Sequence, residues 1–109
     1  MKKTSIEIQI NDNLIKGEGK KENNILILNT KDELIKYNLE NNILIKESKD
    51  LKIKLNFIDK TIDYELVNEK MNFHNIFEVF SLTNYNKQVI IKYRIEHEDF
   101  SLVINYETI

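Results

Sequence analysis

The stretch from Lys87 to Glu107 constrains the fold most strongly, because it consists of two amphipathic arms around a short polar segment. With residues 96–99 as a hairpin loop, one face carries only apolar pairs: Ile95 with Phe100, Tyr93 with Leu102, Ile91 with Ile104 and Val89 with Tyr106. Such a face is typical of a half-buried sheet. A one-residue slip would turn every apolar side chain to the opposite face, where only Ile90 and Val103 interrupt the polar residues.

The same alternation of apolar and polar residues predicts strands over most of the chain. Besides 87–95 and 100–107, the predicted strands cover residues 5–11, 25–28, 34–39, 43–45, 51–57 and 62–66. Residues 11–24 contain both glycines and several charges, so we interpret them as a mobile loop with at most a short strand at Leu14-Ile15. The spacing of Gly17 and Gly19 lacks the third glycine and the helix that a phosphate-binding loop requires.

Two further hairpins follow from turns made by polar residues, since the chain has no proline. A turn at Lys31-Asp32 sets Leu28 against Ile35 and Leu26 against Tyr37. A turn at Asp59-Lys60 sets Phe57 opposite Ile62, Leu55 opposite Tyr64 and Ile53 opposite Leu66.

Residues from Met71 to Leu82 allow two interpretations. Phe73, Ile76, Phe77 and Phe80 recur with the spacing of one helix face, and Asn72 could cap such a helix. As a strand, the segment alternates only if a bulge intervenes near Asn75. Strands at short spacing on both sides favour the strand.

Composition bounds the class of protein. The 109 residues suit one domain, 1–109, that is large enough to bury a core without disulfides or metals. Cysteine is absent, which excludes disulfides, thiolate zinc sites and a cysteine nucleophile. The net charge is −2 and the basic residues are scattered, so we expect no nucleic-acid binding. No apolar run is long enough to cross a bilayer, and we expect a cytoplasmic protein without a membrane partner.

No residues form a recognisable catalytic or metal-binding pattern. His97 lies in the segment Glu96–Asp99, where a solvated turn is a better interpretation than a metal contact. His74 lies among Phe73, Ile76 and Phe77, and is more simply a structural or surface histidine than a general base. No nucleophile motif is present, and the carboxylates are dispersed along the chain. We therefore expect no enzyme activity, no catalytic residue and no cofactor or metal.

The strand count and the tight turns predict an all-β fold, an antiparallel meander barrel of eight or possibly nine strands. Its predicted interior is bulky and contains no alanine or glycine: Ile8, Ile53, Leu55, Phe57, Tyr64, Ile91, Tyr93, Leu102, Ile104 and Tyr106. Such an interior favours a filled barrel over a hollow one. The three tyrosine hydroxyls on this face would need partners, which water or a ligand could supply.

The order of segments resembles a bacterial family of uncharacterised calycin-like barrels, the YwiB-like family. The resemblance rests on Asn41–Glu47 followed by Leu51–Phe57, on Tyr64-Glu65, and on the closing hairpin Ile90–Tyr93 with Ser101–Tyr106. The family's Tyr-x-Thr-x-x-Gly pattern is absent, because Leu66 and Glu69 stand at its threonine and glycine positions. The resemblance implies an eight-stranded lipocalin-like barrel, favours a strand over Met71 to Leu82, and brings no known activity.

Two functions remain open from the sequence. One is a protein-interaction or regulatory module, or a homodimer, that binds through an outer wall; Ile90 and Val103 are the candidate contact residues. The other is a carrier or sensor of a small apolar ligand held inside the barrel. The candidate lining residues for that function are Leu55, Phe57, Tyr64, Tyr93, Leu102 and Tyr106.

Overall fold

The computed structural model describes residues 3–108, which form eleven strands and no helix. The strands are β1 (Lys3–Ile10), β2 (Asn13–Glu22), β3 (Ile25–Asn29), β4 (Glu33–Asn38), β5 (Ile43–Ser48), β6 (Leu51–Asn56), β7 (Thr61–Leu66), β8 (Met71–Ile76), β9 (Glu78–Tyr85), β10 (Gln88–Ile95) and β11 (Glu98–Thr108). The all-β, antiparallel prediction is therefore confirmed.

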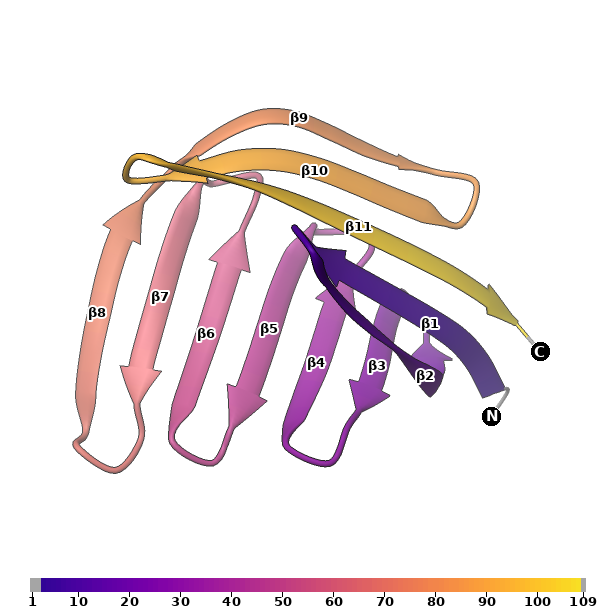
Figure 1. Ribbon diagram of the computed structural model, residues 1–109, viewed down its shortest axis with the longest axis horizontal. Coiled ribbons are helices and arrows are strands. Elements are labelled where there is room, and N and C mark those ends of the chain that lie inside the picture. Colours follow the sequence, from indigo (N-terminus) through magenta and orange to yellow (C-terminus); the bar gives the residue numbers. More distant parts are fainter. Residues whose placement is uncertain (1–2, 109) are drawn as a thin grey trace.

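All eleven strands belong to one sheet that nearly closes on itself. Each strand pairs with the next along the chain except at one place, and β1 pairs with both β2 and β11. The exception is β8 and β9, which form the two edges of the sheet. In Figure 1, β3–β8 stand side by side, and β9, β10 and β11 run across them at one end. The result is barrel-like, with an open seam between β8 and β9.

The strand count differs from the predicted eight or nine at two places. Residues 13–22 form the long strand β2 instead of a mobile loop, and residues 71–85 form two strands that meet at Phe77 instead of one strand with a bulge near Asn75. In β2 the glycines supply space: a Cβ at Gly19 would lie 2.2 Å from the Ile27 carbonyl oxygen and 2.8 Å from Ile6 Cδ1. Their absent side chains let β2 pass close to β3 and β1.

Two predicted hairpin registers are wrong by two residues. In the β10–β11 hairpin, Tyr93 pairs with Phe100 and Ile91 with Leu102, because a two-residue turn at Glu96-His97 replaces the four-residue loop. Glu96 adopts a positive φ of 58°, which this tight turn requires. Because the shift is two residues, every side chain still faces the predicted side.

For the β6–β7 hairpin, the predicted register is wrong in the opposite direction, because the observed loop is longer than the predicted one. Its loop contains four residues, 57–60, so that Leu55 pairs with Ile62 and Ile53 with Tyr64. The Asn56 side chain explains the longer loop, since its Oδ1 accepts hydrogen bonds from the backbone N–H groups of Ile58 and Asp59, at 3.1 and 2.9 Å. The register predicted for β3 and β4 is confirmed.

The same asparagine turn occurs between β4 and β5. Asn38 Oδ1 accepts from the next two turn amides, as Asn56 does, and residues 25–42 resemble residues 43–60 along their length. Each turn directs one apolar side chain inward, Leu39 in the first and Phe57 in the second. Phe77, at the corner between β8 and β9, joins Phe57 there, with ring centroids 5.7 Å apart. These side chains close one end of the barrel.

The core occupies this closed end. Its members are buried side chains from nearly all the strands: Ile6, Ile8, Leu26, Leu28, Ile35, Tyr37, Leu44, Leu55, Phe57, Ile62, Phe77, Val89, Ile91, Tyr93, Leu102 and Ile104. Edge-to-face contacts join Phe57, Phe77 and Tyr93 at centroid distances of 5.2 to 5.7 Å. The gap that remains among Ile6, Tyr37 and Ile104 is too small to admit water. The barrel is filled here.

Candidate binding site

The inner face of β6, β7 and β8 continues beyond the filled core. Side chains two and four residues from buried Leu55 and Ile62 face the same side as these two, and the strand registers align them in rows across the sheet. We call their surface the apolar hollow; its members are Leu51, Ile53, Tyr64, Leu66, Met71 and Phe73. Phe73 is 48% exposed and Met71 46%, so this part of the inner face has no second layer over it.

One ion pair lies beside the apolar hollow on the same inner face. Lys46 stands between Ile35 and Ile53 in the strand registers, and its Nζ lies 3.8 Å from Glu33 Oε2. Both side chains are about three-quarters covered, at 29% and 25% exposure. The pair places two compensating charges where the alternation would otherwise continue as apolar residues.

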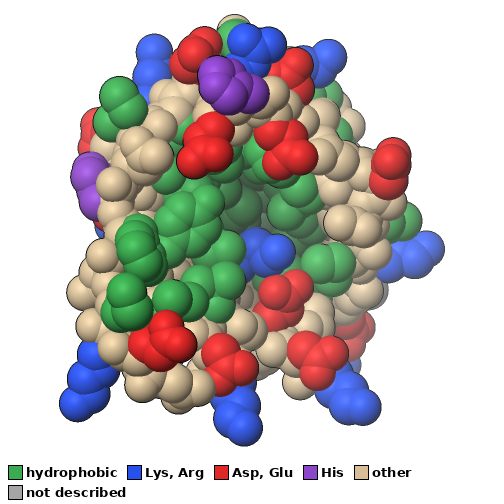
Figure 2. All heavy atoms as spheres, turned by 60° about the vertical axis from the view of Figure 1, so that its left-hand side comes forward, with side chains coloured by type: hydrophobic (Ala, Val, Ile, Leu, Met, Phe, Trp, Pro, Cys, Tyr) green, Lys and Arg blue, Asp and Glu red, His purple; other side chains and the backbone are tan. Residues whose placement is uncertain are grey.

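A cleft of about 550 Å³ joins the apolar hollow to the tip of the β10–β11 hairpin. Tyr64 forms one wall, and the tip supplies the others: Ile95, Glu96, His97, Glu98 and Phe100. The Phe100 ring stacks on Tyr93 of the core with centroids 5.3 Å apart. Figure 2 shows hydrophobic side chains lining a hollow on this face, with acidic side chains and a histidine along its border. The cleft therefore combines an apolar floor with an acidic rim.

Tyr64 lines this cleft, and Tyr93 lies behind its Phe100 ring in the core. Burial, with a smaller contribution from the neighbouring Tyr64, raises the pKa of Tyr93 to about 12. Burial also raises the pKa of Tyr64, and the carboxylate of Glu96 adds to the effect. Both hydroxyls therefore stay protonated at neutral pH and can donate hydrogen bonds. Neither is activated as a nucleophile or base.

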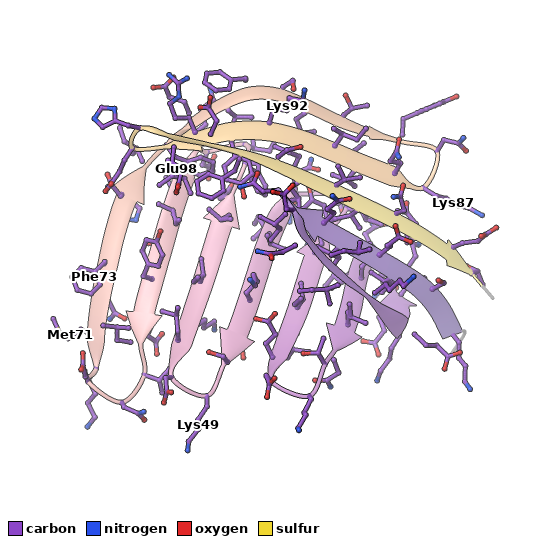
Figure 3. All side chains as sticks on the ribbon, viewed as in Figure 1. Lys49, Met71, Phe73, Lys87, Lys92 and Glu98 are labelled. Atoms are coloured by element: carbon purple, nitrogen blue, oxygen red, sulfur yellow. The ribbon has the colours of Figure 1, made fainter. Side chains whose placement is uncertain are left out.

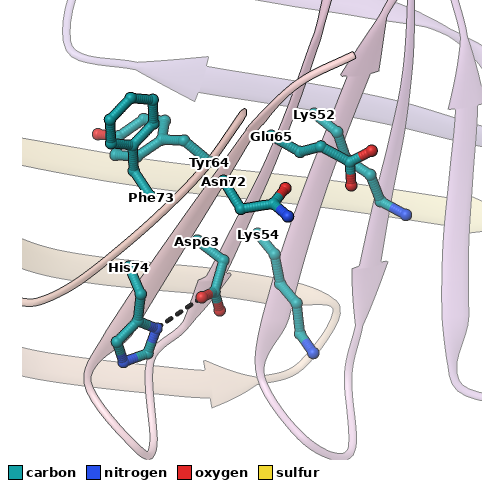
Figure 4. A pocket seen from close by; sticks show the side chains of 8 residues that line it. All are labelled: Lys52, Lys54, Asp63, Tyr64, Glu65, Asn72, Phe73 and His74. Atoms are coloured by element: carbon teal, nitrogen blue, oxygen red, sulfur yellow. Dashed lines mark hydrogen bonds and ion pairs between the residues drawn. The ribbon is translucent and has the colours of Figure 1, made fainter. Parts of the chain in front are cut away.

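A second groove, of about 480 Å³, lies on the outer face of the same strands. His74 Nδ1 lies 2.6 Å from Asp63 Oδ1, and the two side chains are 63% and 48% exposed. Figure 4 shows Lys54, Asp63 and His74 extending together from neighbouring strands, with Tyr64 and Phe73 away from them. Within residues 3–108 no three histidine or carboxylate side chains gather as a metal site would require. This groove is a solvated charged surface.

The predicted candidate residues fall into three groups. Leu55, Phe57, Tyr93 and Leu102 are buried in the filled core, and Tyr64 and Tyr106 are half-buried at its border. Of these six, Tyr64 lines the open cleft. Ile90 and Val103 are paired neighbours on the outer face of β10 and β11 and are half-buried. His97 stands at the cleft rim, and His74 belongs to the outer groove instead of the core.

Sequence reasoning missed the hollow itself, in particular Leu66, Met71 and Phe73. The alternation placed Leu51 and Leu66 on the inner face, but it carries no information on where the second layer ends. One available signal was the segment Met71–Phe77, which is free of Lys, Arg, Asp and Glu although 31% of the chain is charged. A strand without charges at an edge is unusual in soluble proteins.

Searches against family models, curated proteins and solved structures gave no match to this chain. Residues 3–108 contain no helix of the length and apolarity needed to span a membrane.

Proposed function

We propose that this protein is a non-enzymatic binding module that holds an extended, apolar segment of a partner protein in the apolar hollow. The observation that carries the proposal is the exposed inner face of β6–β8, where Phe73 and Met71 are nearly half exposed. Isolated exposed apolar residues are ordinary, but a contiguous apolar surface beside a cleft marks a binding site. We assign no catalytic role to any residue.

The chemistry of the rim specifies the partner. Glu96 and Glu98 border the cleft, while Tyr64, Ile95 and Phe100 supply its apolar lining. Charge complementarity therefore favours a segment whose apolar side chains are flanked by lysine or arginine. The Tyr64 hydroxyl, with its raised pKa, is available to donate a hydrogen bond to a backbone carbonyl of that segment.

The site differs from the outer wall of Ile90 and Val103 that the sequence favoured. Those two half-buried side chains form a small patch among polar neighbours, whereas the hollow spans three strands. The relation to YwiB-like, calycin-like barrels and a cytoplasmic location belong to the same proposal; the filled, nearly closed meander is compatible with that relation.

A small apolar ligand in the cleft is the second candidate function. The observation that favours it is the volume of about 550 Å³ between Tyr64 and Phe100, which is in the usual range for small-molecule sites. Such a ligand would lie at the mouth, because the core among Ile6, Tyr37 and Ile104 has no room for it.

The test is a titration of the isotope-labelled protein with a synthetic peptide, Lys-Leu-Thr-Leu-Thr-Leu-Lys, followed by NMR. We expect amide shifts concentrated at Ile53, Tyr64 and Phe100, and binding at least several-fold weaker for the same peptide with glutamate in place of lysine. Leu66→Lys should abolish binding, because it places a charge in the apolar floor. Leu14→Lys, at a site 49% exposed on β2, is the control and should leave binding unchanged.

The proposed site would be overturned if saturating peptide caused no amide shifts in the apolar hollow, or if the shifts were confined to Ile90 and Val103. A parallel titration with the neutral dye Nile red separates the two candidates. One-to-one dye binding at Tyr64 and Phe100, without peptide binding, would establish the small-ligand function instead.

A further inference from the structure

Strand β8 is an edge without the usual protection. All six of its residues are exposed, and within residues 3–108 no strand pairs with its outer side. Soluble proteins normally protect such edges with lysine, proline or a bulge, because an open edge can pair with another strand. The segment Met71–Phe77 has no Lys, Arg, Asp, Glu or Pro, and its ladder with β7 is regular. Figure 3 shows this strand at the margin of the molecule, with Met71 and Phe73 beside it.

The backbone of β8 indicates which groups are free to pair. The N–H of Phe77 donates to the carbonyl of Lys60 at 3.0 Å, in line with the β7–β8 register. Because hydrogen-bonded pairs alternate along an antiparallel ladder, Phe73 directs its N–H and C=O toward β7. Asn72 and His74 direct theirs away from the sheet. The next outward N–H, at Ile76, already donates to Asn75 Oδ1 at 2.8 Å.

We propose that β8 pairs antiparallel with β8 of a second copy of this chain, about a two-fold axis at Phe73. In this register Asn72 lies opposite His74 of the second copy, and each such pair exchanges both backbone hydrogen bonds. Phe73 lies opposite its own counterpart in a non-hydrogen-bonded pair, where side chains approach most closely. The inference concerns an interface and does not depend on what the apolar hollow binds.

The side chains agree with this register on both faces of the sheet. On the outer face, His74 Nδ1 is paired with Asp63, so its Nε2 remains available to the Asn72 amide of the second copy. On the inner face, the two phenylalanines meet, and the hollows of the two copies become one trough. A shift by one residue along each strand would set Phe73 opposite Asn75 and His74 opposite itself, with the bonded N–H of Ile76 in the ladder.

The absence of charge points to a second copy as the occupant of this edge. In a two-fold strand pair the residues next to the axis lie near their own counterparts, so a lysine or glutamate at such a position would repel its own copy. Strand β8 carries none. The other edge, β9, begins at Glu78 and its Phe80 ring already contacts Arg94, 5.1 Å from the guanidinium carbon. A six-residue strand pair is smaller than a standard interface, so the dimer is weak and its population depends on protein concentration.

The experiment is sedimentation velocity on the full chain from about 1 µM to 1 mM. We expect a reversible monomer–dimer equilibrium in the wild type and monomer throughout for Phe73→Lys and Phe73→Glu separately. An equimolar mixture of these two variants should recover the dimer, since the opposite charges then face each other across the axis. Leu14→Lys is the matched control, with an exposed fraction of 49% against 48% for Phe73.

Circular dichroism of each variant checks that it is folded before its mass is interpreted. A wild type that stays monomeric at 1 mM would overturn the proposal, as would a dimer that persists in Phe73→Lys. Failure of the mixture to dimerise would equally reject the axis at Phe73. Each variant is shown to be folded on its own, so a folding defect cannot explain such a failure.

Discussion

The two ends of strands β6 and β7 obey the same alternation and yet have different surroundings. At the closed end, Leu55 and Ile62 are 6% and 1% exposed beneath Phe77 and Tyr93. A few residues along the same strands, Leu51 and Leu66 point to the same side but extend beyond the core. Both ends have an apolar inner face. They differ because β9, β10 and β11 cross only one of them (Figure 1).

This difference separates the residues that stabilise the fold from those available for binding. Apolar side chains at the closed end gain from burial and close packing. Those of the apolar hollow, such as Met71 and Phe73, keep much of their surface in water, so they contribute less to folding and are available to a binding partner. Stability measurements on matched pairs of residues can test this division directly.

The largest expected difference in stability is between alanine substitutions of two phenylalanines, Phe57 at the closed end and Phe73 in the apolar hollow. Phe57→Ala should lower the free energy of unfolding by about 3–5 kcal/mol, because Phe57 is 2% exposed and contacts both Phe77 and Tyr93. Phe73→Ala should lower it by about 1 kcal/mol or less, since its ring is half exposed. Urea denaturation at low micromolar protein concentration measures both. Equal losses would mean that the apolar hollow is part of the core.

The second-largest effect is a loss of folding stability at alkaline pH, which arises from Tyr93 at the closed end. The folded pKa of Tyr93 is about 12 against an ordinary 10.0, so the unfolded chain releases this proton first. Stability is therefore fully present below pH 10 and falls as pH rises to about 12, by about 2–3 kcal/mol for this group. Tyr93→Phe should reduce that pH dependence, measured by urea denaturation at several pH values. An unchanged pH dependence in the variant would contradict the assigned environment of Tyr93.

The smallest effect on stability is expected for a substitution on the outer face of β6. Lys54 is exposed and alternates with buried Leu55 on β6, so Lys54→Ala should change the free energy of unfolding by no more than about 0.5 kcal/mol. Leu55→Ala, its neighbour on the inner face, should cost about 2–5 kcal/mol. Thermal and urea denaturation compare the two. A loss for Lys54→Ala that matches the loss for Leu55→Ala would contradict the assigned faces of β6.

Local alternation predicted which side of the sheet each residue faces, and it did so for Leu55, Phe57 and Tyr93. Registers were less predictable because they depend on turns. The side-chain hydrogen bonds of Asn56 and the positive φ of Glu96 each moved a hairpin by two residues. Strand β2 was missed because its glycines, which are typical of loops, here serve a close strand contact at Gly19.

The candidate site was harder to predict than the fold. The exposure of Tyr64 and Phe73 depends on where the β10–β11 layer ends, which is a property of the whole chain and has no local sequence signal. The acidic rim likewise arises from a turn at Glu96 that lies near Tyr64 only after the sheet has curled. The charge-free run of β8 was visible in the sequence, but its meaning depends on its position at an edge.

The pairing of β1 with β11 also has a consequence for the order of assembly. Every other ladder in the sheet joins strands that follow one another along the chain, whereas this ladder joins residues such as Thr4 and Thr108. Local hairpins close on short loops, but this contact must overcome the entropy of almost the entire chain. Until β11 is in place, β1 is itself an exposed edge and Ile6 and Ile8 lack their neighbours Tyr106 and Ile104. Among these eleven strands, β11 is synthesised last, and it completes the environment of β1.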